Sequence, residues 1–154
     1  MKDFIRLLDK TTSLTHELLC ALGEERAALS EQDTTILETA IEKKLGAAQA
    51  LQAMDPQRDA ALKKQGAAPG LAGLQAILAN NADQKLHDSW QALCDASQRC
   101  KEENLLVGTM IRKNQLVTEQ ALQVLRRGSI ETVQTYSANG TPPRQSLSNP
   151  LGKA

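Results

Sequence analysis

The chain has 154 residues, a length typical of one domain, and carries 18 Lys and Arg residues against 18 Asp and Glu residues. This balance argues against a dedicated nucleic-acid binder, which needs an excess of basic residues to displace counterions from phosphate. Aromatic residues make up 2% of the chain, too few for base stacking or an aromatic ligand pocket, whereas its Leu, Ala, Gln, Glu and Lys content predicts an all-α protein.

No segment predicts export or membrane insertion. The first residues contain an early Asp3 and no long apolar run, so we expect no signal peptide, and nowhere do about 18 apolar residues follow one another. The three cysteines, Cys20, Cys94 and Cys100, form no C-x-x-C pair, and we expect them to be reduced thiols on helices. The sequence therefore predicts a cytoplasmic protein with no cofactor and no metal ion.

The first third of the chain predicts a helical hairpin. Apolar residues recur at three- and four-residue spacing over residues 3–29 and again over 34–54, which is typical of two amphipathic helices. Asp33 is expected to cap the second helix, because its carboxylate can accept from the free amides of the first turn. The four-residue connection makes the two helices antiparallel neighbours.

Two short helical pieces are expected between the hairpin and the last helix. Asp55 and Pro56 are typical of an N-cap followed by the first residue of a helix, and we expect this helix to stop near Gly66. Residues 67–73, which are rich in Gly and Pro, predict a loop, and residues 71–78 predict one or two further turns.

The longest predicted helix covers residues 83–127, and Gly128 is expected to end it. Positions that alternate three and four apart from Leu86 to Leu125 are mostly apolar, which is typical of a heptad pattern. A helix of this length spans about 68 Å, whereas a compact globule of this chain length is roughly 40 Å across. Either the molecule is elongated, or the helix bends, or part of it projects.

The predicted fold class is therefore all-α. We expect an elongated antiparallel helical bundle or coiled coil with an N-terminal hairpin, short middle helices and one long C-terminal helix. The bundle is assigned to residues 1–128. Residues 129–154 are expected to hold a short amphipathic segment, with Ile130, Val133 and Tyr136 as its apolar positions, and a flexible tail rich in Ser, Asn, Pro and Gly.

The two histidines do not predict an enzyme. His16 and His87 are each followed by a carboxylate, Glu17 and Asp88, which would repel a phosphoryl group. No Gly-rich loop is followed by Lys-Ser or Lys-Thr, so no phosphate loop is present. A phosphotransfer-like signalling bundle that uses one of the two histidines is kept as an alternative.

Adjacent charged residues are expected to lie on solvated helix faces. The acidic pairs are Glu24-Glu25 and Glu102-Glu103, and basic pairs such as Lys43-Lys44 are dispersed among acids. Acid–base catalysis needs two carboxyl groups in different environments, with one at least partly buried. Adjacent residues on an amphipathic helix point about 100° apart and are mostly solvated, so we expect no catalytic pair here.

The distal part of the long helix carries more apolar surface than a hairpin helix needs. From Leu105 to Leu125, 11 of 21 residues are apolar, and most of them project on one side of the helix. The short middle helices could cover part of this surface but are too short to follow the whole helix. The surplus must be covered by the chain itself, by a second copy or by a different protein. Burying one Leu or Val contributes about 1.5–3 kcal/mol, so a few residues make a substantial interface.

Two stretches of the chain resemble the FlgN-type flagellar export chaperones. The first lies in the predicted hairpin, and the second runs from the long helix toward the C-terminus, where the chain is similar to the family's Thr-Tyr-Gly…Gly ending but has Ser137 in place of the usual Gly. The matching residues are Leu18-Leu19, Glu24-Glu25-Arg26, Leu29, Asp33, Leu37, Lys44-Leu45, Asn114, Leu122, Leu125 and Thr135-Tyr136-Ser137-Ala138-Asn139-Gly140.

The resemblance implies a non-enzymatic chaperone that binds hook-associated (hook–filament junction) proteins in the cytosol. Such a chaperone prevents their premature assembly and delivers them to the export gate or ATPase complex of the flagellar type III export apparatus. It also implies that the C-terminal amphipathic helix contacts the cargo and that Tyr136 docks at the export gate. The partner-binding residues expected on this basis are Val117, Ala121, Leu122, Val124, Leu125, Ile130, Val133 and Tyr136.

A chaperone of this kind without cargo is expected to be a monomer or a weak homodimer. The alternative is a self-associating helical scaffold in which the surplus apolar face makes a dimer. Neither alternative requires nucleic acid or membrane insertion.

Overall fold

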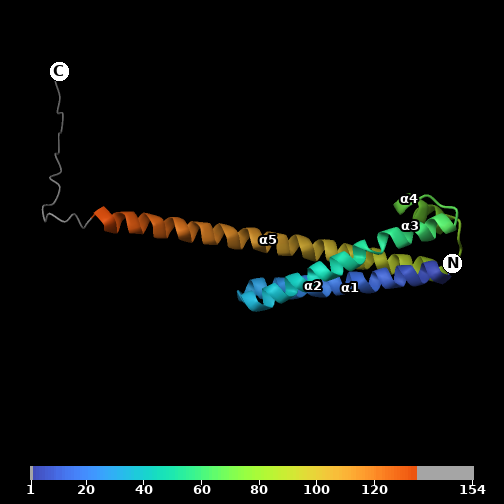
Figure 1. Ribbon diagram of the computed structural model, residues 1–154, viewed down its shortest axis with the longest axis horizontal. Helices are drawn as coiled ribbons and strands as arrows, with labels where there is room; N and C mark the ends of the chain where they lie inside the picture. Colours follow the sequence, from blue (N-terminus) through green and yellow to red (C-terminus); the bar gives the residue numbers. More distant parts are fainter. Residues whose placement is uncertain (1, 135–154) are drawn as a thin grey trace, which may run out of the picture. The chain divides into compact units, whose positions relative to one another are not determined.

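The computed structural model describes the backbone of residues 2–134 and the side chains of residues 2–127. Five helices follow one another in this part of the chain: α1 (Lys2–Glu31), α2 (Thr34–Gln52), α3 (Asp55–Lys64), α4 (Gly70–Ala79) and α5 (Gln84–Gln134) (Figure 1). The all-α class, the N-terminal hairpin, the short middle helices and the long last helix are therefore confirmed. The chain divides into two compact units, residues 1–113 and 114–154.

The hairpin of α1 and α2 closes over a short connection, and the two helices lie side by side (Figure 1). Gln32 turns the chain with a left-handed backbone, φ 58°, and Asp33 then caps α2. The Asp33 carboxylate accepts from the backbone N–H of Thr35 and of Ile36, each at 3.0 Å, so the predicted cap is confirmed.

Small side chains let the two helices of the hairpin approach each other closely. α2 buries Ala40 and Ala47, which lie one heptad apart, and α1 buries Ala21 and Ala28 at the same spacing. The distance between packed helices depends on the side chains at the contact, and alanine keeps it at the short end of the usual range.

We expect Asp33→Ala to lower the free energy of unfolding by about 1 kcal/mol, because two amides of the first turn of α2 lose their acceptor. Urea denaturation followed by circular dichroism measures this. Asp33→Asn keeps an acceptor oxygen, so its free energy of unfolding should be close to that of the original chain. An Asn variant as unstable as the Ala variant would show that the capping bonds do not carry the effect.

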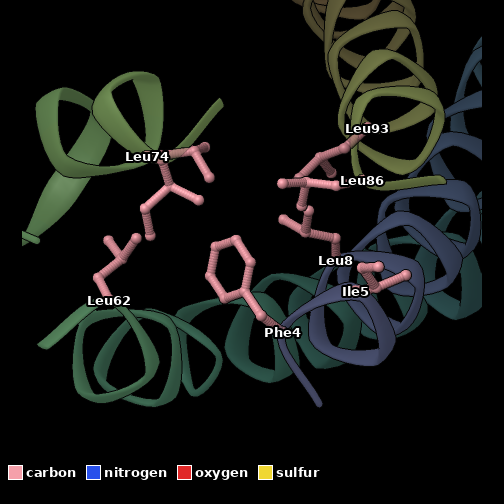
Figure 2. Close-up of a cluster of buried hydrophobic side chains, with 8 residues drawn as sticks. Phe4, Ile5, Leu8, Leu62, Leu74, Leu86 and Leu93 are labelled. Carbon is pink, nitrogen blue, oxygen red and sulfur yellow. The ribbon is translucent and has the colours of Figure 1, made fainter. Parts of the chain in front are cut away.

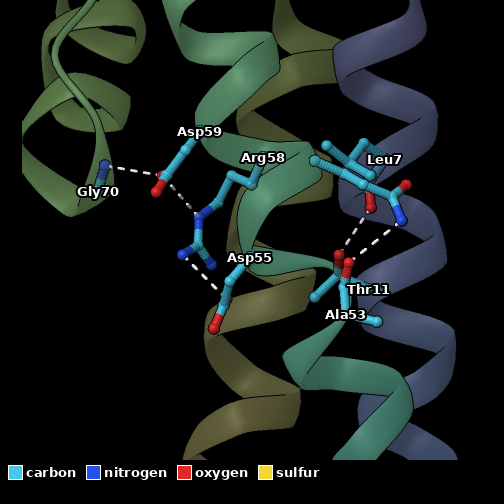
Figure 3. Close-up of polar contacts among 8 residues, drawn as sticks. Leu7, Thr11, Ala53, Asp55, Arg58, Asp59 and Gly70 are labelled. Carbon is cyan, nitrogen blue, oxygen red and sulfur yellow. Dashed lines mark hydrogen bonds and ion pairs between the residues drawn. The ribbon is translucent and has the colours of Figure 1, made fainter.

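The prediction that Asp55 caps α3 is wrong. The N-cap position is occupied by Met54, whose backbone is helical (φ −80°, ψ −24°) rather than extended, and no side chain caps the helix. Asp55 is instead the first helical residue, and its carboxylate pairs with Arg58 at 3.0 Å (Figure 3). A capping side chain needs an extended backbone to reach the free amides, and the tight turn after α2 does not supply one.

The predicted loop over residues 67–73 is too long, because α4 already begins at Gly70. The Gly70 N–H donates to the carboxylate of Asp59 on α3 at 3.0 Å, and its φ of 78° suits glycine (Figure 3). At Gly73 a Cβ atom would overlap the backbone carbonyl of Ala68. Gly70 therefore permits the abrupt start of α4, and Gly73 permits close contact between α4 and the loop before it.

The main core lies within residues 1–113, where four helices meet. Figure 2 shows Leu62 of α3 and Leu74 of α4 reaching toward Phe4, with Leu8 and Leu86 beside them. The buried members of this cluster are Phe4, Ile5, Leu8, Leu62, Leu74, Ile77, Leu86 and Leu93. The two short helices thus pack over the first turns of α5 rather than over the surplus apolar surface of residues 105–125.

The long helix begins as expected but does not stop at Gly128. Asp83 accepts from the N–H of Lys85 at 3.1 Å just before α5, whereas the backbone remains helical through Gly128 to Gln134. Glycine weakens a helix by about 1 kcal/mol but ends it only where the backbone turns left-handed. The proposed domain boundary at 128/129 remains a prediction. None of the described helices has a stretch long and apolar enough to cross a membrane.

Candidate partner-binding surface

The apolar stripe of α5 is buried in its first part. Leu86, Leu93, Cys100 and Val107 recur at seven-residue spacing along the helix and are all at most 8% exposed. They pack against the rest of residues 1–113, and Leu86 and Leu93 belong to the main core.

The same helix leaves its large apolar side chains bare over residues 114–127. Val117, Leu122, Val124 and Leu125 are 48% to 70% exposed, and Ala121 is exposed with them. Val117, Ala121, Val124 and Leu125 follow the i, i+4, i+7, i+8 spacing that places residues on one side of a helix, and Leu122 borders that side. We call these five residues the distal face.

The distal face can bind another helix but has no chemistry for catalysis. Covering a Leu or Val side chain contributes about 1.5–3 kcal/mol, so four such residues give a substantial interface. An exposed stripe of this kind is typical of helix-in-groove recognition, where anchors at i, i+4 and i+7 enter an apolar surface.

Of the eight partner-binding residues predicted from the sequence, the five of the distal face are described and exposed. Ile130 and Val133 belong to α5, but their side chains are outside the described part of the chain. Tyr136 and the predicted tail lie outside the described residues.

The histidines offer no converging catalytic group. His16 is exposed on α1. The Nε2–H of His87 donates to the backbone carbonyl of Asn81 at 2.8 Å and so tethers the start of α5 to the preceding turn.

The expectation that adjacent charges are solvated is wrong for Glu25, which is 1% exposed. Glu25 lies three residues from the buried Leu22 and three from the buried Ala28, so it belongs to the apolar side of α1. Both of its carboxylate oxygens accept from Lys44 Nζ, at 2.7 and 2.8 Å. A buried charge requires such a partner, and the pair ties α1 to α2.

The charges on either side of Glu25 extend this link. Glu24 pairs with Lys43 of α2 at 2.7 Å, and Arg26 pairs with Glu103 of α5. The residues that carry the family resemblance in the hairpin therefore hold three helices together.

A groove within residues 1–113 was not foreseen from the sequence. It consists of two hollows of about 670 and 390 Å³, which share Leu18, Cys100 and Lys101. α1, α2 and α5 line both hollows, and α3 and α4 add Asp55, Arg58 and Leu71 to the larger one. The periodicity of single helices does not report the space between them, so no sequence signal could have located it.

The cysteines are free thiols, as expected. Burial raises the pKa of Cys100, whose Sγ donates to the carbonyl of Thr15 at 3.2 Å, and burial also raises the pKa of Cys94. Cys20 is exposed. Within the described part of the chain, no group of three or more His, Cys, Asp or Glu side chains could hold a metal ion.

Comparison with known proteins gives one clear result. A family model described as FlgN protein matches residues 1–144, which is most of the chain. The chain matches none of the curated proteins or solved structures with which it was compared. The family match covers the hairpin, the groove and the distal face together.

Proposed function

The chain belongs to the FlgN family of flagellar export chaperones, which bind hook-associated proteins in the cytoplasm, and on this premise we propose that the distal face of α5 holds the cargo. The observation that carries this proposal is the change in burial along one helix. The stripe of α5 is covered up to Val107, and the large apolar side chains on its distal face are exposed from Val117 onward. A stable protein gains nothing from such exposure, so the exposure points to a partner.

Binding at this face explains how the chaperone keeps its cargo from assembling. The resemblance implies that the terminal segments of hook-associated proteins are amphipathic and unfolded before assembly. A segment that folds as a helix against the distal face has its apolar side covered and cannot pair with another subunit. The cost of ordering that segment lowers the net affinity, which favours release at the export apparatus.

The test is a titration of the full chain with a purified hook-associated protein, followed by size-exclusion chromatography with light scattering. We expect a complex of one chain with one cargo molecule and suppression of cargo self-assembly. A cargo that lacks its terminal segments is the control and should elute separately. Failure to bind any hook-associated protein of the same bacterium would overturn the proposal.

We propose that the chain without cargo is a monomer or a weak homodimer. The bare distal face also suits the alternative, a self-associating scaffold, because two such faces could cover each other. Light scattering over a range of concentrations separates the two. A stable dimer at low micromolar concentration that persists when cargo is added would favour the scaffold.

We expect Tyr136→Ala to retain cargo but lose its delivery to the export gate. The expectation follows from the family resemblance, which implies a role for Tyr136 in docking rather than in the cargo contact. The measurement compares secretion of hook-associated proteins into the medium with their capture by the chain in cell extracts. Tyr136→Phe keeps the ring and serves as the control. Normal secretion by the Ala variant would remove Tyr136 from the docking step.

A further inference from the structure

The groove in residues 1–113 has the form of a helical bundle with one position left open. α1, α2 and α5 line both of its hollows, and Leu18 of α1 is shared between them. At the N-terminal end of α1, the short helices α3 and α4 fill the corresponding space, because Leu62 and Leu74 pack over Phe4 and Leu8 (Figure 2). Beyond them the two hollows are open to solvent.

The lining of the groove is apolar and in places unusually exposed. Leu71 lines the larger hollow and is 58% exposed, and Leu45 lines the smaller hollow and is 54% exposed. The small residue Ala48 lines the smaller hollow together with Leu45 and allows a close approach there. An α-helix is about 10 Å across with its side chains, and its apolar stripe would fill both hollows in turn.

One charge in the groove has no counterpart. Lys44 is paired with Glu25, and Arg58 is paired with Asp55. Lys101 lines both hollows, and it forms none of the ion pairs found in the described part of the chain. A helix that enters the groove therefore gains from a carboxylate placed opposite Lys101.

We propose that this groove is a second cargo-binding surface, which takes an amphipathic helix of the hook-associated protein with a carboxylate facing Lys101. This inference rests on the function proposed above. A second copy of the chain is a poorer occupant, because its bare helical stretch is cationic. Residues 112–127 contain Arg112, Lys113, Arg126 and Arg127 against Glu119 alone, so they would bring like charge toward Lys101.

The first experiment measures cargo affinity by isothermal titration calorimetry with the full chain and purified hook-associated protein. Ala48→Trp fills the smaller hollow, and Lys101→Glu reverses the unpaired charge of the groove. We expect each variant to weaken binding at least tenfold. Gln49→Trp adds the same ring at the neighbouring exposed position, which lines neither hollow, and should change affinity less than twofold. Circular dichroism shows whether each variant keeps its helicity.

The second experiment uses the cysteines of the chain as a footprint. Cys94 lines the larger hollow, whereas Cys20 lies on another surface between α1 and α2. We expect cargo to slow the labelling of Cys94 by N-ethylmaleimide at least fivefold, as read by mass spectrometry, and to leave Cys20 unchanged.

The outcomes separate this inference from the function on which it rests. Unchanged affinity of the Ala48 and Lys101 variants, together with unprotected Cys94, would overturn the groove proposal while cargo binding itself stands. Absence of binding by the unaltered chain would overturn the function instead. Protection of Cys94 that rises with chain concentration in the absence of cargo would assign the groove to a second copy and contradict the proposal.

Discussion

Replacing Leu122 and Leu125 together by Asp is expected to abolish the capture of hook-associated protein. Both leucines are exposed, at 48% and 69%, so their loss removes little packing from the free chain. In the complex the change removes two apolar anchors, worth about 1.5–3 kcal/mol each. It also places two carboxylates against an apolar partner, which is unfavourable. Because about 1.4 kcal/mol is a factor of ten, affinity should fall by at least roughly a hundredfold.

The matched control makes the same change in net charge on the same helix. Arg112→Gln with Gln123→Asp lowers the net charge by the same two units at exposed polar positions on the side of the helix opposite the distal face, and this variant should retain cargo within a few-fold. Pull-down and calorimetry measure capture, and circular dichroism checks helicity. Full cargo capture by the Leu variant would contradict the assignment of the distal face. Equal loss in the control variant would show that the change in net charge alone explains the effect.

The sequence predicted the helices because their signals are local. Periodic apolar residues mark α1, α2 and α5, and the Asp33 cap depends only on the residues of one turn. The prediction that Asp55 caps α3 failed because capping also needs an extended backbone, and the turn after α2 remains helical. The prediction that the long helix stops at Gly128 failed for a related reason, since glycine permits a left-handed turn but does not impose one.

The candidate sites divide in the same way. The distal face could be predicted because surplus apolar surface on one helix is visible in its sequence. The groove could not, since it exists only where α1, α2 and α5 are placed together. Glu25 lies between these cases. Its spacing from Leu22 and Ala28 places it on the apolar side of α1, but only the position of α2 reveals Lys44 as its partner.

The largest effect on stability is expected from Lys44→Met. The change leaves the Glu25 carboxylate buried with both hydrogen bonds lost. Breaking a buried pair by removing one partner costs about 3–5 kcal/mol. The Lys44 side chain is 26% exposed, so water reaches the gap and the cost should fall near the lower limit, about 3 kcal/mol. Urea denaturation measures the free energy of unfolding. A loss below about 1 kcal/mol would show that Glu25 is solvated without its partner.

Removing both charges should recover most of this loss. In Glu25→Leu with Lys44→Met no buried charge remains, and apolar residues of similar size often replace a buried ion pair at little cost. Glu25→Leu alone should be milder than Lys44→Met, because the freed ammonium of Lys44 can turn toward water. The three variants form a double-mutant cycle, and a coupling of at least about 1 kcal/mol is expected. Strict additivity would mean that the two residues stabilise the hairpin independently.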